Sequence, residues 1–263
     1  MTPRFHTLVT GASMGIGREI AAEFASKGEN LVLVARSRGR LDEAASELSS
    51  RYGVEVLVCC EDLGVAGAPA RIAGFCRERG VVVDRLVNCA GFSVAGTFLK
   101  LGAEELQQMA MVNMVSLAEM SRLFLPEMVA RGRGTVVNIA SLAGFQGVPG
   151  MGLYSATKSF VVNLTEAVNE ELRGTGVRLF AVCPGFIDND NFYERAGHDR
   201  KRIVVPVSPP SVVVRALRRG LDNGAIVVLP TLFDRVMVFL QRLMPRRPVV
   251  MLAGIFAGAG EKK

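Results

Sequence analysis

A glycine-rich turn between an apolar run and a helical pattern is the feature that most restricts the fold of this chain. Residues 5–10 are typical of a buried strand, Gly11, Gly15 and Gly17 follow it, and residues 18–26 have helical periodicity. Glycine permits a sharp turn and lets a phosphate approach backbone N–H groups at a helix N-terminus, where the dipole favours an anion. This order predicts an α/β fold with a dinucleotide site, although a glycine turn can also have a purely steric origin.

The remaining chain repeats the alternation of strand and helix. A long helical pattern at residues 103–131 is expected to be interrupted near Pro126. With 263 residues and 49% hydrophobic content, the chain is long enough for one large core, so a single α/β domain over residues 1–230 is expected, followed by an extension at 231–263. Further strands are predicted at residues 31–35, 54–60, 85–89, 135–140, 177–183 and 225–230, and further helices at 41–51, 69–79, 154–173 and 211–221.

The charge and cysteine content restrict the partners and the compartment. A net charge of +6 suits nucleic acid, an acidic membrane surface or a phosphorylated cofactor, but 6% aromatic residues and no Trp leave little surface for base stacking. Nucleic acid is therefore not an expected partner. Five cysteines without regular spacing indicate no metal site, and Cys59 and Cys60 are expected to be buried thiols. Because no apolar leader precedes the first strand, a cytoplasmic protein is expected.

A phenol and an ammonium group lie four residues apart at Tyr154 and Lys158, and such a pair shares one helix face. A free tyrosine has a pKa of about 10, so acid–base chemistry near neutrality needs a lower value, which a nearby cation favours. Ser141 follows the strand at 135–140, where its hydroxyl would lie beside the tyrosine. These three side chains predict a proton-transfer site, whereas the Tyr–Lys pair alone is also an ordinary helical pair. Asn113, an amide in an apolar helical pattern, can satisfy backbone groups, hold water, or do both.

Cofactor choice depends on the residue at the end of the second strand. Arg36 occupies this position, where a carboxylate would bind a ribose 2′-hydroxyl and an arginine accommodates a 2′-phosphate. Ser37 and Arg38 are close enough in sequence to add donors. Asp62 follows the third strand and is placed to meet the adenine edge or to cap a loop. The sequence therefore predicts the phosphorylated cofactor, NADP(H).

Two later segments concern the substrate. Residues 186–210 form a long non-periodic stretch, expected to be a substrate lid, whose apolar residues suit an apolar substrate. Its basic residues either meet an anionic group or are simply solvated. In the extension, residues 232–244 and 249–259 are apolar, but neither reaches the ~20 residues of a transmembrane helix. Packing on protein is the favoured interpretation, and a membrane interface stays open.

The order of these motifs resembles the short-chain dehydrogenase/reductase family over residues 7–229. The resemblance implies a single Rossmann domain with a doubly wound, seven-stranded parallel sheet and helices on both faces. It also implies a nicotinamide cofactor, reversible carbonyl reduction, and a homodimer or homotetramer. The motifs are Thr10 to Gly17, Asp62, Asn88 to Gly91, Asn113, Ser141, Tyr154 with Lys158, and Pro184 with Gly185.

The resemblance also implies a role for each site residue. Tyr154 would give a proton to the carbonyl oxygen, which Ser141 steadies. Lys158 would lower the pKa of Tyr154 and hold the nicotinamide ribose, and Asn113 would hold a water that links Lys158 to solvent. Where the family commonly has Thr, this chain has Asn189, which can still donate and accept hydrogen bonds. The implied cofactor contacts are Gly11, Ser13, Met14, Gly15, Ile16, Gly17, Arg36, Asp62, Leu63, Asn88, Ala90, Gly91, Tyr154, Lys158, Pro184, Gly185, Ile187 and Asn189.

The sequence thus predicts an NADPH-dependent reductase of a ketone or aldehyde with an apolar substrate. One alternative is an NADP(H)-binding regulatory or scaffold protein that keeps the fold without turnover. The complete Asn, Ser, Tyr and Lys set argues against it, since a non-catalytic binder needs no proton-transfer array. Another alternative is a peripheral membrane reductase of a lipid carbonyl.

Overall fold

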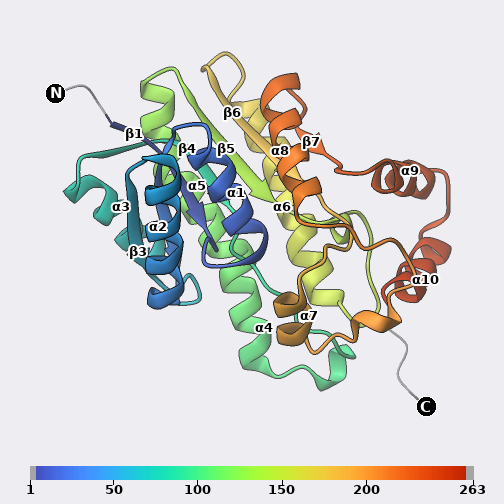
Figure 1. Cartoon of the computed structure of the whole chain (residues 1–263). Coiled ribbons are helices and arrows are strands. Elements are labelled where there is room, and N and C mark those ends of the chain that lie inside the picture. Colours follow the sequence, from blue (N-terminus) through green and yellow to red (C-terminus); the bar gives the residue numbers. More distant parts are fainter. Residues whose placement is uncertain (1–3, 259–263) are drawn as a thin grey trace.

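The computed structural model describes residues 4–258 and contains one parallel sheet (Figure 1). Its strands lie in the order β3-β2-β1-β4-β5-β6-β7, and each pairs with its neighbours in parallel. This confirms the predicted doubly wound, seven-stranded sheet. The strands are β1 (Arg4–Thr10), β2 (Asn30–Ala35), β3 (Val56–Cys60), β4 (Val81–Asn88), β5 (Gly134–Ile139), β6 (Val177–Val182) and β7 (Val227–Val228).

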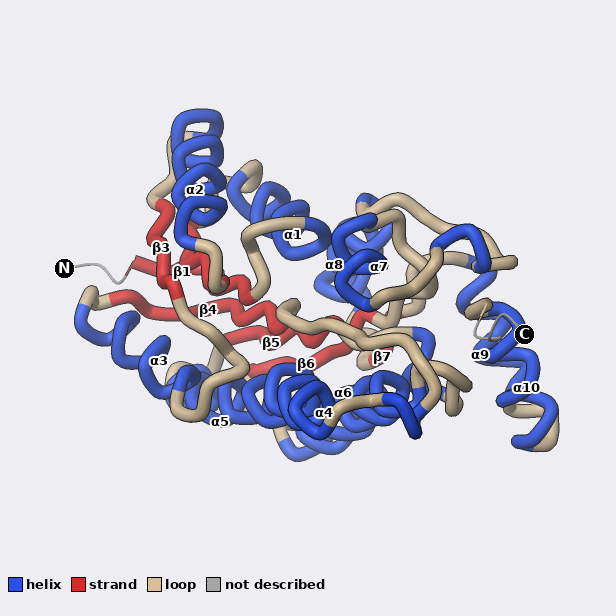
Figure 2. Tube along the Cα trace, turned by 90° about the horizontal axis from the view of Figure 1, so that it is seen from below, coloured by secondary structure: helices blue, strands red, loops and turns tan. Residues whose placement is uncertain are grey.

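Helices cover both faces of the sheet (Figure 2). On one face lie α1 (Gly15–Ala25), α2 (Arg38–Tyr52) and α8 (Ser211–Asn223); on the other lie α3 (Ala68–Glu78), α4 (Ala103–Ala110), α5 (Ser116–Ala130) and α6 (Gly152–Glu171). Parallel strands covered on both faces need continuous apolar runs. The four central residues of β2, for example, are all fully buried.

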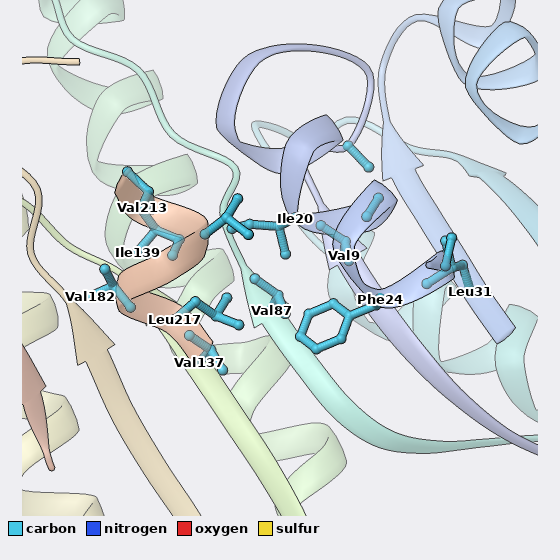
Figure 3. Close-up of a cluster of buried hydrophobic side chains, with 14 of the residues drawn as sticks. Val9, Ile20, Phe24, Leu31, Val87, Val137, Ile139, Val182, Val213 and Leu217 are labelled. Atoms are coloured by element: carbon cyan, nitrogen blue, oxygen red, sulfur yellow. The ribbon is translucent and has the colours of Figure 1, made fainter. Parts of the chain in front are cut away.

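The core on the α1 side joins the two halves of the sheet (Figure 3). Ile20 and Phe24 of α1 are spaced four residues apart and pack with Leu217 of α8 above Val87 and Val137. These side chains are 0–2% exposed, and burying each contributes about 1.5–3 kcal/mol relative to an exposed position. The packing holds the glycine turn that precedes α1 against the strand ends.

The long helical pattern at residues 103–131 is interrupted at a different place from the one predicted. A π-helical segment, η2 (Met111–Val115), separates α4 from α5, whereas Pro126 lies inside α5. Proline removes one backbone hydrogen bond, but Phe124 and Met128 on either side of it are buried and keep the helix on the sheet. The expected break at Pro126 is therefore wrong.

The predicted lid and the last strand also differ from expectation. Residues 186–210 contain a short helix, α7 (Asp190–Ala196), and the turn η4 (Arg200–Arg202). A seven-residue helix is too short to produce a clear periodic pattern. β7 is only Val227–Val228, shorter than predicted, and Cys60 at the end of β3 is exposed rather than buried.

The C-terminal extension forms two further helices, α9 (Leu232–Gln241) and α10 (Arg246–Phe256), beyond the β7 edge of the sheet (Figure 1). Thr231 and Asp234 form a capping box at the start of α9. Gly254 brings α10 onto the loop before α6, because a Cβ at this glycine would lie 3.0 Å from Pro149. The predicted second apolar stretch ends at Ala259, outside the described residues. The boundary between residues 230 and 231 stays a prediction.

No helix among residues 4–258 is both long and apolar enough to cross a bilayer. In the same range, no group of three or more His, Cys, Asp or Glu is placed to hold a metal ion.

A buried polar network ties the centre of the sheet to its helices. Asn88 and Asn138 are cross-strand partners on β4 and β5, and Asn88 Nδ2 donates to Asn138 Oδ1 over 2.9 Å and to Ser121 Oγ of α5 over 3.1 Å. Asn138 Nδ2 in turn donates to Thr165 Oγ1 of α6 over 2.9 Å. Every member is buried. The side chain of Asn88 is therefore used inside the sheet.

Replacing Asn138 by alanine should destabilise the fold, because Asn88 then loses a buried acceptor and Thr165 loses its donor. An unsatisfied buried polar group costs about 1–3 kcal/mol, so we expect Asn138→Ala to lower the free energy of unfolding by about 2 kcal/mol in urea titrations. Asn163→Ala is the control, since Asn163 is exposed and bonds Ser159 of its own helix; it should change stability by less than about 0.5 kcal/mol. Equal losses in the two variants would contradict the role of the network.

Candidate active site

A cavity of about 740 Å³ lies at the carboxyl ends of the strands, where open α/β sheets place their sites. Every predicted site residue lines it except Gly15, Asn88 and Asn113. Those that do are Gly11, Ser13, Met14, Ile16, Gly17, Arg36, Asp62, Leu63, Ala90, Gly91, Ser141, Tyr154, Lys158, Pro184, Gly185, Ile187 and Asn189.

The glycine turn forms one end of this cavity. Gly11 and Gly15 have φ of 69° and 55°, in the left-handed region, and a Cβ on Gly17 would collide with the Gly11 carbonyl. The N-terminus of α1 has no side-chain cap and no acidic residue in its first turn. Its N–H groups are thus free of side-chain acceptors beside the cavity, as an anion site requires.

Basic residues surround the end of β2. Arg36 and Ser37 line the cavity, and Arg36 Nη1 lies 3.7 Å from Asp62 Oδ2. Arg38, predicted to add a donor, is instead paired with Asp42 one turn along α2 at 3.2 Å and does not border the cavity. Arg40 takes this place: it lines the cavity, and its Nη1 lies 3.9 Å from Met14 Sδ in the glycine turn. Two positions along a helix rotate a side chain by about 200°, which explains the exchange.

Ser141, Tyr154 and Lys158 converge at the other end. Ser141 follows β5 and accepts a hydrogen bond from Ala143 N over 3.1 Å, and its hydroxyl also hydrogen-bonds Tyr154. Lys158 lies one turn after Tyr154 on α6, with Nζ 5.7 Å from the ring centroid and donating to the Ile139 carbonyl over 2.8 Å. All three are buried, so the strand end and the helix together confirm the predicted convergence of these side chains.

The pKa values in this cluster differ from the sequence-based expectation. Burial raises the pKa of Tyr154 to about 12, and its hydrogen bond with Ser141 opposes this only in part. Burial also lowers the pKa of Lys158 to about 8. The expectation that Lys158 lowers the tyrosine pKa is thus wrong for the protein alone, since burial favours the neutral form of each group. Tyr154 is therefore a protonated donor at neutral pH.

Asn113 lies just behind this cluster, in the π-helical turn η2. Its Oδ1 accepts from Phe92 N over 3.1 Å, and its Nδ2 donates to Phe92 O over 2.9 Å and to Thr157 Oγ1 over 3.1 Å. The side chain is 1% exposed and does not line the cavity. It fixes the loop after β4 to α6, next to Lys158.

Comparison with known proteins identifies the family. Residues 6–199 match the family model described as short chain dehydrogenase. The chain belongs to the short-chain dehydrogenase/reductase family. It is accordingly an oxidoreductase of carbonyl and CH–OH groups whose Rossmann fold binds a nicotinamide cofactor.

Three relatives of this short-chain dehydrogenase show the extent of the similarity. The ketoacyl reductase HetN of Nostoc sp. is 31% identical over 224 residues, which are 84% of this chain and 77% of HetN. The very-long-chain 3-oxoacyl-CoA reductase of Bos taurus is 34% identical over 184 residues, 68% of this chain but only 58% of that protein. The solved short-chain dehydrogenase from Sphingobium yanoikuyae in complex with NADPH is 34% identical, with a TM-score of 0.81 over 91% of this chain and 94% of that one.

The glycine turn of this short-chain dehydrogenase also contacts the lid. A Cβ on Gly15 would lie 2.6 Å from Asn189 Nδ2, so glycine leaves room for the side chain that replaces the family's usual threonine. Asn189 caps α7, with its Oδ1 accepting from Phe192 N over 3.4 Å. The residue therefore links the cofactor turn to the lid helix.

Residues of the C-terminal extension complete the cavity, and sequence motifs could not identify them. Asp234, 3% exposed, lies against Gly185, where a Cβ would be 2.5 Å from its Oδ1. The apolar periodicity of residues 232–256 was the available signal, but it did not say which face turns inward. The lining residues from this segment are Phe233, Asp234, Met237, Leu240, Gln241, Met244, Val249, Leu252, Ala253 and Phe256.

The pKa of Lys158 predicts the pH dependence of this short-chain dehydrogenase. Below about pH 8 the side chain is a cation, and its charge is lost as pH rises through 8, while Tyr154, with a pKa of about 12, stays protonated. We expect kcat/KM for carbonyl reduction to fall above pH 8 with a slope of one decade per pH unit. The Lys158→Arg variant should be slower, but it should not show this decline because arginine keeps its charge over the whole range. A wild-type profile that stays flat to pH 10 would contradict the assignment.

Proposed function

We propose that this chain is an NADPH-dependent reductase of ketones with a long apolar substituent. The observation that carries the proposal is the buried Tyr154 hydroxyl, hydrogen-bonded to Ser141, in a cavity to which the lid and the C-terminal helices contribute mainly apolar side chains. A protonated phenol suits proton donation to a developing alkoxide, which is the direction of reduction.

The chain's own residues fit the cofactor. The uncapped N-terminus of α1 and the glycine turn would receive its diphosphate, and Gly91, where a Cβ would lie 3.4 Å from Lys158 Nζ, leaves space for its nicotinamide ribose. When bound, the nicotinamide supplies a hydride to the carbonyl carbon. Tyr154 gives its phenolic proton to the oxygen, so that ketone, NADPH and one proton yield alcohol and NADP⁺.

Ser141 and Lys158 would assist this proton transfer. The Ser141 hydroxyl would donate to the substrate oxygen as negative charge develops there, a contact stronger in the transition state than in the ground state. Lys158 uses one of its three N–H donors on the Ile139 carbonyl, which leaves two for the ribose. Asn113 would act indirectly, by fixing the loop after β4 against α6 and so keeping room for a water beside Lys158.

The preference for NADPH is proposed from two arginines. Arg36 and Arg40 border the same end of the cavity, and their guanidinium groups provide planar donors for a 2′-phosphate. Asp62 lies beside Arg36 and accepts from Gly64 N over 2.8 Å, which keeps its carboxylate turned into its own loop. The NADPH complex of the Sphingobium relative supports this choice.

The substrate class follows from the cavity and the relatives. Beyond Tyr154 the wall is built by apolar residues of the lid and the C-terminal helices, including Phe186, Phe192, Met237, Leu252 and Phe256. Such a wall binds hydrocarbon and offers little to a sugar. Because two of the relatives are named as ketoacyl and 3-oxoacyl-CoA reductases, a 3-oxoacyl chain is the substrate that we propose to test first.

A homodimer or homotetramer is also proposed. Leu123 and Val129 of α5 are exposed in the single chain, as is Val115 just before it. Apolar side chains on an outward helix face are a basis for pairing with a second copy.

The cytoplasm remains the proposed location, with the protein either free or at a membrane surface. Because the chain belongs to an oxidoreductase family, we favour an enzyme over an NADP(H)-binding scaffold protein without turnover.

Removing the phenolic hydroxyl should stop catalysis without preventing cofactor binding. We expect Tyr154→Phe to lower kcat for 3-oxoacyl reduction by about 10²–10⁴, the usual contribution of a general acid, with the Kd of NADPH changed by less than about threefold. NADPH absorbance across 3-oxoacyl, steroid, bulky-ketone and sugar carbonyls gives the rates. Tyr52→Phe, on the outer end of α2, is the matched control and should keep full activity. Turnover by Tyr154→Phe within tenfold of wild type would refute its role.

Cofactor choice should depend on Arg36. Charge-assisted hydrogen bonds contribute roughly 1.5–3 kcal/mol each, so NADPH should bind at least about tenfold more tightly than NADH. Arg36→Ala should remove most of this preference and Arg40→Ala part of it, in titrations at two salt concentrations. Arg38→Ala is the control, because Arg38 is paired with Asp42 away from the cavity. The same NADPH-to-NADH ratio in wild type and Arg36→Ala would contradict the assignment.

A further inference from the structure

The outer side of α9, α10 and the turn between them is an apolar surface, which we call the C-terminal apolar face. It holds nine of the sixteen exposed large apolar side chains in the described part of the chain. Phe239 and Leu243 are 59% and 70% exposed. Such a concentration at one end of a molecule marks an interaction site. The face consists of Leu232, Val236, Phe239, Leu240, Leu243, Met244, Met251, Leu252 and Ile255.

The charges that residues 232–256 carry are nearly all positive. Between residues 232 and 256 the sequence has four arginines and a single carboxylate, Asp234, which is 3% exposed and belongs to the capping box of α9. All four arginines are exposed: Arg235, Arg242, Arg246 and Arg247. An anionic partner with an apolar interior complements this surface.

Two of these arginines occupy positions that helix stability alone does not favour. Arg246 and Arg247 begin α10, and its first turn contains no acidic residue. A helix N-terminus carries partial positive charge, so cations there are disfavoured. Anionic groups outside the protein would offset this repulsion, which is a second reason to expect a negatively charged surface beside α10.

The face is continuous with the active-site cavity. Leu240, Met244 and Leu252 line the cavity and are at the same time exposed at the surface. The same two helices therefore form a wall of the cavity and the outer face. An apolar group lying against α9 and α10 would therefore contact side chains that also line the cavity.

The face is held in place by the rest of the protein. Gly254 packs against Pro149 in the loop before α6, and Val204 N donates to the Phe256 carbonyl over 3.4 Å. At the other helix, the Thr231–Asp234 capping box fixes the start of α9 beside Gly185. The apolar side chains are thus presented on a preformed surface.

We propose that the C-terminal apolar face docks on an anionic lipid bilayer. Helices of ten and eleven residues are too short to span it, so they lie in the interface with the four arginines at the headgroups. The cavity then opens toward the acyl chains, and an apolar ketone enters from the membrane; this second part rests on the proposed function.

Co-sedimentation of the full-length protein with vesicles tests the docking without any activity assay. Vesicles of phosphatidylcholine with 30% phosphatidylglycerol should pellet the wild type, and pure phosphatidylcholine vesicles should bind at least tenfold less. Phe239→Glu combined with Leu243→Glu should abolish binding. Val65→Glu is the matched control: Val65 is 52% exposed in the turn that follows β3, the strand at the opposite edge of the sheet from β7, and this variant should bind like wild type.

Charge is tested separately, with variants that leave the apolar side chains intact. Each basic residue at a membrane surface strengthens binding about fivefold. Replacing both Arg246 and Arg247 by glutamine should therefore weaken binding to anionic vesicles about thirtyfold. Arg51→Gln with Arg77→Gln, on α2 and α3, should leave it unchanged. Circular dichroism melting checks that every variant is folded.

Two results would overturn the proposal. One is a wild type that stays in the supernatant with both vesicle types. The other is a glutamate pair that binds anionic vesicles as strongly as wild type does; a loss of oligomeric mass of that variant in light scattering would then assign the face to a second copy of the chain. Docking that is found in a protein inactive on every carbonyl would uphold the surface and refute only the proposed function.

Discussion

The site depends on how the ends of the neighbouring strands β1 and β4 are held together. After β1 the following strands are added toward one edge of the sheet, and after β4 they are added toward the other edge. Thr10 Oγ1 accepts hydrogen bonds from Cys89 N and Ala90 N, each over 3.0 Å, and donates one to the Val87 carbonyl over 3.3 Å. One buried hydroxyl thus satisfies two backbone donors where the strands separate. The crevice that opens there keeps its shape, and the glycine turn lies beside it.

Burial determines the electrostatics at the other end of the cavity. Burial shifts both Tyr154 and Lys158 toward their neutral forms, so the protein holds a phenol that retains its proton and an ammonium whose pKa is lowered to about 8. The Ile139 carbonyl stabilises the ammonium with one hydrogen bond. The same desolvation strengthens every polar contact made by a substrate oxygen.

Sequence reasoning succeeded where the signal was local. Turn glycines, strand ends and the Tyr154–Lys158 spacing identified residues most of which line the cavity, because neighbours in sequence stay neighbours in the fold. It failed where orientation depends on tertiary packing. Asn88 lies in a strand, as predicted, yet its amide points to Asn138 inside the sheet, and Arg40 rather than Arg38 reaches the cavity. No pattern within one segment could reveal which helix would cover a side chain.

The C-terminal helices show the same limit of sequence reasoning, because tertiary packing decides what covers each face of a helix. A helix with apolar residues on both faces needs a cover for each face. The inner sides of α9 and α10 find theirs in the cavity and in the loop at Pro149. The outer sides of these two helices are not covered by any of residues 4–258. Since the outer residues are held by the same packing that completes the active-site cavity, whatever covers them also lies beside that cavity, which joins the outer face and the cavity in one structural unit.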